Sequence, residues 1–255
     1  MHSWVLPLAM FAGLPLSLSF LSVGCNPANG PLDEDEVWNA ERREMVDVLR
    51  RYGIRDSRVL DAMGRVKRHR FIPERFRRHG MAYGDHPCSI GEGQTISQPY
   101  IVAYMTEKMG IRAGESVLEI GAGSGYQAAV LAEVGARVYS VEIIPALADH
   151  ARDVLAKEGY GEKVSVRTGD GYQGWAENAP YDVVIGTCAP ESIPEALVEQ
   201  LREGGRMILP VGELMNQRLV VVIKRNGHAV VEDDLAVRFV PMVSGKGTDW
   251  VDGIR

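Results

Sequence analysis

The sequence is short of cysteine and, over its first 32 residues, has no charged side chains. Its three cysteines, Cys25, Cys88 and Cys188, are too few for the disulfide framework of a small secreted domain. The net charge of -6 indicates no general affinity for nucleic acid or anionic membranes, so no nucleic-acid partner is expected. With 255 residues, 45% of them hydrophobic, the chain is long enough for one globular domain with a modest extension.

Residues 1–32 contain no Asp, Glu, Lys or Arg, and residues 4–24 form an almost continuous apolar run. We interpret residues 1–25 as an apolar leader, because such a run is typical of a secretory signal or an N-terminal anchor. Small residues precede Cys25, as they precede the lipidated cysteine of bacterial lipoproteins, which indicates possible membrane attachment. The alternative is a start at Met45, with residues 1–44 a translation artefact. Residues 26–35, rich in Asn, Pro, Gly and Asp, are predicted to be a linker.

Residues 36–255 are predicted to form a single domain, and residues 36–110 are its helical N-terminal part. Apolar periodicity and capping residues predict helices over residues 36–52, 56–66 and 99–109. Residues 65–79 hold seven Lys or Arg and one acid. We favour a solvated helical face there over a nucleic-acid patch, because the chain is acidic and aromatic residues spaced for base stacking are missing. Residues 80–98 are punctuated by glycine and are expected to be loop.

Residues 111–243 show short apolar runs that alternate with helical stretches. Strands are expected over residues 116–120, 137–143, 164–168, 182–187 and 206–210, and helices over residues 124–134, 145–158 and 193–202. This alternation predicts an α/β fold with a doubly wound, mostly parallel sheet. Asn226-Gly227 between residues 219–224 and 229–231 indicates an antiparallel hairpin, and a further strand over 236–240 precedes a tail over 244–255.

A glycine-rich turn, Gly121-Ala122-Gly123-Ser124-Gly125, follows the strand at 116–120. Glycines let the backbone N–H groups at a helix N-terminus approach a ligand. A dinucleotide site needs its third glycine one place later, where this chain has Tyr126, so the spacing argues against NAD.

Two acids follow at the ends of the next strands. Glu142 can accept hydrogen bonds from both ribose hydroxyls, and Asp170, followed by Gly171, can receive an adenine amino group. Two carboxylates repel phosphates but suit S-adenosylmethionine, whose sulfonium is positive. We therefore predict an S-adenosylmethionine site and no metal. Its residues are Gly121, Gly123, Gly125, Glu142, Asp170 and Gly171. Glu119 either meets the ammonium group of the ligand or merely flanks the turn.

The segment over residues 90–100, IGEGQTISQPY, places Thr95, Ser97 and Gln98 just before a helix that begins at Pro99. Neutral donors beside a helix N-terminus hold a carboxylate well. Ser97 as a simple helix cap is the other interpretation, and on these residues alone it is the simpler one.

This segment, with Tyr83-Gly84-Asp85 before it, strongly resembles the protein-L-isoaspartate O-methyltransferases. Residues 117–125, 169–171, 179–182, 204–212 and 239–243 carry the same resemblance, which covers about residues 45–243. It implies a Rossmann-like sheet of seven strands with a reversed last strand pair. It also implies methylation of the α-carboxyl of L-isoaspartyl residues in damaged proteins and peptides, by a monomer, with the active-site serine at Ser97.

The resemblance and the leader disagree about location. The family and the supply of S-adenosylmethionine favour the cytoplasm, whereas the leader and Cys25 favour export or anchoring. Cys88 and Cys188 depart from the family's usual aliphatic residue and alanine, and we expect small buried roles for both.

Methyl transfer to a carboxylate needs alignment more than acid–base help, because an α-carboxyl, with an ordinary pKa of about 3.3–3.7, is already ionised at pH 7. Ser97 is therefore expected to donate a hydrogen bond that orients the substrate, and Thr95 and Gln98 to shape the pocket. One alternative is a methyltransferase of another substrate. The other is an envelope binding module that keeps the fold without catalysis.

Overall fold

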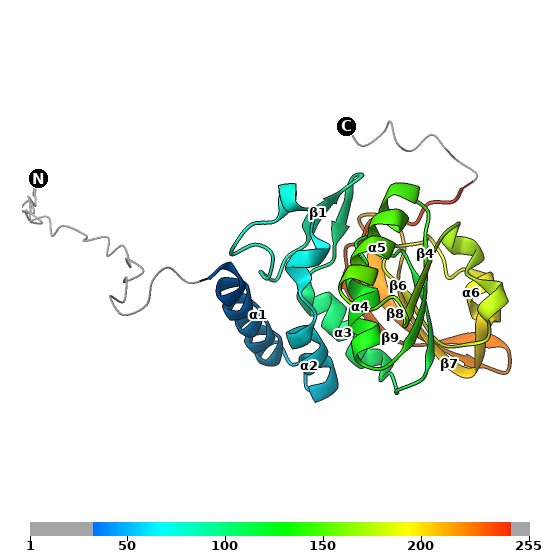
Figure 1. The fold of residues 1–255 in the computed structure, drawn as a ribbon. Helices are drawn as coiled ribbons and strands as arrows, with labels where there is room; N and C mark the ends of the chain where they lie inside the picture. Colours follow the sequence, from blue (N-terminus) through cyan, green and yellow to red (C-terminus); the bar gives the residue numbers. More distant parts are fainter. Residues whose placement is uncertain (1–32, 246–255) are drawn as a thin grey trace, which may run out of the picture.

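A computed structural model of the chain describes residues 33–245 (Figure 1). The apolar leader predicted over residues 1–25, with Cys25, lies outside the described residues, as do most of the linker and the last ten residues. Within the described range, none of the helices is both long and apolar enough to span a bilayer.

The N-terminal part begins with two helices, α1 (Glu34–Arg51) and α2 (Ser57–Arg65), which form as predicted. Two 3₁₀ turns follow, η1 (Arg68–Phe71) and η2 (Glu74–Phe76), in the basic stretch. The prediction of a solvated face is wrong for Arg68 and His69, which are buried at 0% and 2% exposure. With three residues per turn, a single 3₁₀ turn directs consecutive side chains to all sides, so a turn packed on the core buries some of its polar residues.

Residues 80–98 are not wholly loop, because β1 (Cys88–Gly91) and β2 (Gln94–Ile96) form an antiparallel hairpin within them. We call this hairpin the substrate hairpin. Its turn holds Glu92 and Gly93 at positive φ. Strands of three and four residues are too short for an alternating pattern to be visible in the sequence. The helix α3 (Pro99–Met109) follows with the predicted bounds.

The main sheet has seven strands in the order β5-β4-β3-β6-β7-β8-β9. Its strands are β3 (Ser116–Ile120), β4 (Arg137–Glu142), β5 (Val164–Thr168), β6 (Tyr181–Gly186), β7 (Leu201–Val211), β8 (Gln217–Arg225) and β9 (His228–Val237). The pairs from β5 to β7 are parallel, and β8 is antiparallel to both of its neighbours. The prediction of a doubly wound sheet that ends in antiparallel strands is confirmed.

The predicted strand ends needed two corrections. β7 begins at Leu201, where a helix was expected to continue, because Leu201 already pairs with Tyr181 of β6. β9 is one continuous strand rather than two pieces. The predicted Asn226-Gly227 turn joins β8 to β9, and both residues have positive φ, at 52° and 78°, as a tight hairpin turn requires.

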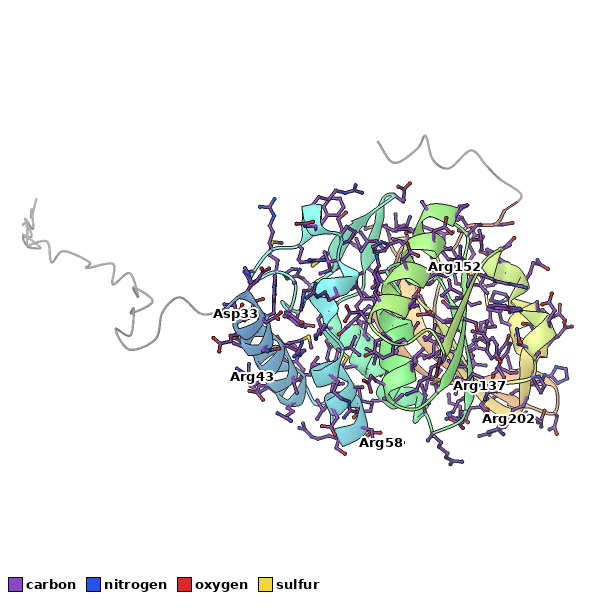
Figure 2. All side chains as sticks on the ribbon, viewed as in Figure 1. Asp33, Arg43, Arg58, Arg137, Arg152 and Arg202 are labelled. Carbon is purple, nitrogen blue, oxygen red and sulfur yellow. The ribbon has the colours of Figure 1, made fainter. Side chains whose placement is uncertain are left out.

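Helices cover the sheet on both sides, so both faces of its central strands are buried (Figure 1). The helices are α4 (Tyr126–Glu133), α5 (Pro145–Lys157) and α6 (Glu195–Gln200), and two 3₁₀ turns, η3 (Gly171–Gln173) and η4 (Ala176–Asn178), follow β5. Along β3, Val117 packs into one core cluster and its neighbour Leu118 into the other. The labelled Arg58, Arg137 and Arg202 lie at the end of the domain opposite β1 (Figure 2).

Candidate active site

The site lies where the order of the sheet reverses, between the carboxyl ends of β3 and β6. Open α/β sheets bind ligands at such a switch point. β3 runs into Gly121 and β6 into Thr187, whose hydroxyl donates to the Gly121 carbonyl at 2.5 Å. Gly121 has a φ of 93°, and a Cβ there would lie 2.5 Å from the Thr187 Oγ1. Only glycine fits this position.

A cavity of about 360 Å³, here called the glycine-turn cavity, opens at this point. Five predicted site residues line it, namely Thr95, Gly121, Gly123, Glu142 and Gly171. Gly171 leaves room that a side chain would fill, because a Cβ there would lie 2.6 Å from the Cγ2 of Ile120. The glycine turn and the residue after Asp170 therefore shape one cavity, as expected.

Glu142 is the carboxylate that lines the glycine-turn cavity, and it is 5% exposed. Its Oε2 accepts from the Gly123 N–H at 2.8 Å and its Oε1 from the Ile144 N–H at 3.0 Å. Burial raises the pKa of Glu142, although these N–H groups favour its charged form. Each oxygen keeps a lone pair that can accept from a ribose hydroxyl.

Three predicted cofactor residues do not line the cavity. Glu119 is fully buried and accepts the Ser140 hydroxyl, and burial raises its pKa to about 8. Gly125 is the N-cap of α4 at a φ of 85°. Asp170 accepts from the Tyr172 N–H at 2.9 Å and, through its other oxygen, from Ser244 and Gly245.

Sequence reasoning missed the apolar wall of the glycine-turn cavity. The missed lining residues include Ile143, Ile144, Leu147, Thr187, Cys188 and Val240–Val243. The C-terminal segment reaches the cavity because the Ala189 N–H donates to the Val240 carbonyl and the Met242 N–H to the Ala189 carbonyl. For part of this wall a signal was available, because residues just after the carboxyl end of a parallel strand tend to line the ligand site. No local pattern predicted the arrival of residues 240–243.

Cys88 is buried at 8% exposure, as expected, but Cys188 is only partly buried and lines the glycine-turn cavity. Burial, with Glu142 and Glu119 nearby, raises the pKa of the Cys188 thiol to about 12. The thiol therefore stays protonated at neutral pH and acts as a small apolar group.

A second cavity of about 40 Å³, here called the Ser97 cavity, adjoins the first. The two share Thr95, Gly121, Gly123 and Thr187. The remaining lining residues are Ile96, Ser97, Val102, Ala122, Ser124, Tyr126 and Gln127. None of these side chains carries a charge. The glycine turn therefore separates a larger pocket from a small polar pocket that contains Ser97.

The interpretation of Ser97 as a helix cap is wrong. Gln98 holds the N-cap position of α3 and makes no side-chain cap hydrogen bond. Asp85 caps the helix instead, since it accepts from the Tyr100 N–H and from the Gln98 amide, both at 2.8 Å. Ser97 is left to line its cavity, whereas the Gln98 side chain is directed to Asp85.

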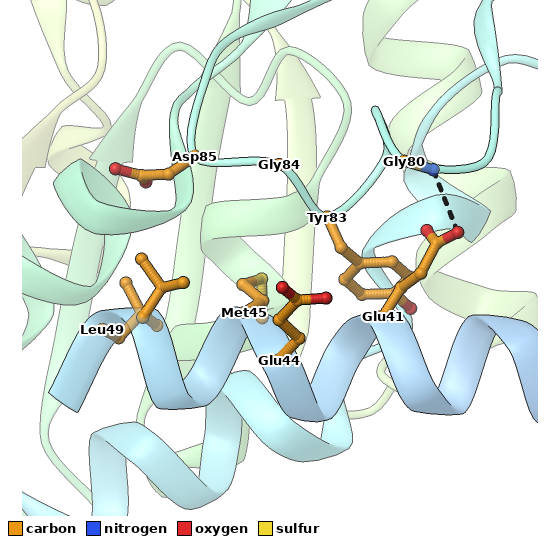
Figure 3. A pocket seen from close by; sticks show the side chains of 9 residues that line it. Glu41, Glu44, Met45, Leu49, Gly80, Tyr83, Gly84 and Asp85 are labelled. Atoms are coloured by element: carbon orange, nitrogen blue, oxygen red, sulfur yellow. Dashed lines mark hydrogen bonds between the residues drawn. The ribbon is translucent and has the colours of Figure 1, made fainter. Parts of the chain in front are cut away.

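A third cavity of about 160 Å³ lies between α1 and the loop at residues 80–85 (Figure 3). Glu41 closes one end by accepting from the Gly80 N–H at 2.9 Å, and Asp85 lies at the other end. None of its lining residues belongs to the other two cavities. It therefore adjoins the cap of α3 but not the glycine turn.

The residues present fit S-adenosylmethionine. The glycine-turn cavity combines apolar walls, two glycines of the turn and one buried carboxylate, which suits an adenosine moiety. Over residues 33–245, no cluster of three or more His, Cys, Asp or Glu side chains is placed to hold a metal ion.

Comparison with known proteins agrees with this geometry. The family model of protein-L-isoaspartate(D-aspartate) O-methyltransferase matches residues 40–247. A protein-L-isoaspartate O-methyltransferase of Gloeobacter violaceus is 52% identical over 79% of this chain and 98% of its own length. One from Methanoculleus marisnigri is 50% identical over 84% of this chain and 96% of its own.

Solved structures show the same fold. A protein-L-isoaspartate O-methyltransferase matches with a TM-score of 0.72 at 31% identity, over 81% of this chain and 67% of that one. A structure from Plasmodium falciparum that contains S-adenosyl-L-homocysteine matches with a TM-score of 0.69 at 24% identity, over 79% of this chain and 98% of that one.

Proposed function

This chain belongs to the protein-L-isoaspartate O-methyltransferase family, and we propose that it transfers a methyl group from S-adenosylmethionine to the α-carboxyl of L-isoaspartyl residues. Methylation of damaged proteins and peptides at this carboxyl begins their repair. The observation that carries the assignment is the junction of the glycine-turn cavity with the Ser97 cavity across Gly121 and Gly123. A methyl donor and a small carboxylate can meet at such a junction.

We assign the cofactor contacts to Gly121, Gly123, Glu142 and Gly171. Glu142 accepts from the ribose hydroxyls, and the backbone of the glycine turn lies along the ligand. S-adenosylmethionine supplies an electrophilic methyl group on a sulfonium. Glu119, Gly125 and Asp170 hold the elements that carry these contacts. This division follows from which of these residues line the glycine-turn cavity and which do not.

Ser97 and Thr95 orient the substrate carboxylate in the Ser97 cavity. Neutral hydroxyl donors fix the carboxylate without the tight ion pair that would weaken it as a nucleophile. The apolar neighbours Ile96 and Val102 exclude water, so proximity and alignment carry the rate. Gln98 acts indirectly, because it holds Asp85 at the N-terminus of α3.

Methyl transfer to matched peptides tests the proposed function. One peptide carries L-isoaspartate and its twin carries normal aspartate at the same place, with radiolabelled S-adenosylmethionine as donor. We expect label in the isoaspartyl peptide alone. Equal labelling of both peptides would refute the substrate assignment, and labelling of neither, with S-adenosylhomocysteine still bound, would favour the non-catalytic module.

We further propose that the enzyme acts in the cytoplasm, where S-adenosylmethionine is supplied. The apolar leader and Cys25 support the alternative of export or membrane attachment. N-terminal sequencing of the mature protein after cell fractionation separates the two. A chain cleaved before Cys25 in the membrane fraction would overturn the cytoplasmic proposal.

A further inference from the structure

Among the described residues, Arg68 is a buried cation that forms no ion pair. Its side chain lies in η1 at 0% exposure, and its Nη2 donates to the His86 carbonyl at 3.2 Å. Its Nε and Nη1 have no hydrogen-bond partner among residues 33–245. Within the same range, no carboxylate forms an ion pair with Arg68.

Such a charge is costly to bury, and its visible contacts are modest. The guanidinium lies over the ring of Tyr126, 5.2 Å from the centroid. One cation–π contact and one hydrogen bond to a carbonyl stabilise the guanidinium by less than the free energy that its desolvation costs. The charge therefore points to a negative group that binds nearby.

The neighbours of Arg68 belong to the substrate side of the site. Tyr126 lines the Ser97 cavity, and His86 lies two residues before the substrate hairpin. Asp85 is a nearby acid whose negative charge favours the charged guanidinium, but it forms no ion pair with Arg68, because its two oxygens accept from the Tyr100 N–H and the Gln98 amide. The Ser97 cavity, lined only by uncharged side chains, shares Tyr126 with this guanidinium.

We propose that Arg68 is the positioning residue that makes the Ser97 cavity selective for a carboxylate. It supplies positive potential from behind Tyr126 and does not touch the substrate. This inference rests on the proposed function, since it identifies the group that neutralises the α-carboxylate of the isoaspartyl residue.

The indirect arrangement has a physical reason. A cation inside the cavity would repel the sulfonium of S-adenosylmethionine and pair tightly with the carboxylate that must attack it. A buried arginine one side chain away still stabilises the anion, because a low-dielectric interior screens charge weakly. Arginine keeps its proton at every working pH, so the potential is constant.

The test compares binding of two peptides to the S-adenosylhomocysteine complex of the full chain. One peptide carries isoaspartate with a free α-carboxylate, and the other carries the same residue as its α-carboxamide. The readout is the ratio of their two Kd values in wild type, Arg68→Met and Arg68→Lys. Arg206→Met is the matched control, because Arg206 is also largely buried but pairs with Glu115 away from both cavities.

We expect wild type to bind the carboxylate peptide more tightly than the carboxamide peptide. In Arg68→Met the ratio of the two Kd values should fall about tenfold, which corresponds to about 1.4 kcal/mol. Arg206→Met should keep the wild-type ratio. A folded Arg68→Met protein with an unchanged ratio would overturn the proposal and leave Arg68 a structural role. A wild type that methylates no isoaspartyl peptide would instead refute the proposed function.

Arg68→Lys gives an independent readout if the methionine variant does not fold. A buried lysine loses its proton at a depressed pKa, unlike arginine. The carboxylate preference of this variant should match wild type at low pH and decline as pH rises. A pH-independent loss of preference in Arg68→Lys, or a decline of equal size in wild type, would contradict the proposal.

Discussion

The two halves of the site are built differently. On the cofactor side, β3 pairs in unbroken parallel register with β4 and β6, and the glycine turn is held by backbone hydrogen bonds. On the substrate side, β1 and β2 share only three residue pairs, with a register shift at Ser89 to Gly91. Side chains from elsewhere, Asp85 and Arg68, support that hairpin and the helix after it.

This difference separates two kinds of failure. Changes on the cofactor side should remove ligand binding, because the backbone there is both the scaffold and the contact surface. Changes on the substrate side should reduce turnover and leave cofactor affinity intact. Four substitutions test that separation, and the pH dependence of unfolding tests the burial of Glu119, in order from the largest expected effect to the smallest.

Gly121→Ala should abolish cofactor binding. The added Cβ would lie 2.5 Å from the Thr187 Oγ1. The φ of Gly121 is also 93°, which residues other than glycine rarely adopt. We expect the Kd of S-adenosylhomocysteine, measured by calorimetry, to rise at least about a hundredfold, or about 2.7 kcal/mol. Gly64→Ala is the control, because its Cβ would meet only Val46, at 3.7 Å. Near-normal affinity in Gly121→Ala would place the ligand elsewhere.

Glu142→Gln should weaken S-adenosylhomocysteine binding about tenfold to a hundredfold. The amide keeps one acceptor oxygen, so it loses a charge-assisted hydrogen bond worth about 1.5–3 kcal/mol. Glu119→Gln is the matched control, since Glu119 does not line the cavity and its raised pKa of about 8 keeps it protonated at neutral pH. If the two variants lost equal affinity, the assignment of the ribose contact to Glu142 would be wrong.

Ser97→Ala should lower kcat for isoaspartyl peptides about tenfold, because one orienting donor is lost. Its Kd for S-adenosylhomocysteine should stay within about twofold of wild type. Ser89→Ala, in the same hairpin but outside the Ser97 cavity, should leave both quantities unchanged. Loss of cofactor affinity in Ser97→Ala would show that the residue acts on the other side of the junction.

Burial of Glu119 should make stability depend on pH. Its folded pKa of about 8 exceeds the ordinary glutamate value of 4.5, so the folded state holds a proton that the unfolded state releases. The free energy of unfolding should therefore fall as pH rises from about 5 to 8, by at most about 1.4 kcal/mol per pH unit. Urea unfolding across this range measures the slope. Glu119→Gln should flatten it, and an identical slope in that variant would assign it to other groups.

Asp85→Asn should have the smallest effect. The asparagine still accepts from the Tyr100 N–H but loses its charge at the N-terminus of α3, which costs about 0.5–1 kcal/mol of stability. We expect kcat to fall a few-fold, with S-adenosylhomocysteine affinity unchanged. A larger fall in cofactor affinity than in kcat would contradict the separation of the two halves.

Most of the sheet was predictable because its signals are local. Segments rich in apolar or β-branched residues, such as residues 116–120 and 164–168, and the Asn226-Gly227 turn specify strands and a hairpin through nearby residues alone. The sequence singled out Ser97, and its alternative role as a cap was excluded only because Asp85 occupies the helix N-terminus in the folded chain. The substrate hairpin escaped prediction because its strands are too short to show a period.

The sequence by itself determined the glycine turn, the strands that precede and follow it and the acid at the end of the next strand, Glu142, because backbone dihedrals and alternation depend on neighbouring residues. The tertiary structure alone decided which side chains line the cavities. It buried Glu119 against Ser140, bonded Asp170 to Ser244 and Gly245, brought residues 240–243 to the glycine-turn cavity and buried Arg68 next to Tyr126. Those placements depend on contacts between residues far apart in the chain, which no local pattern encodes.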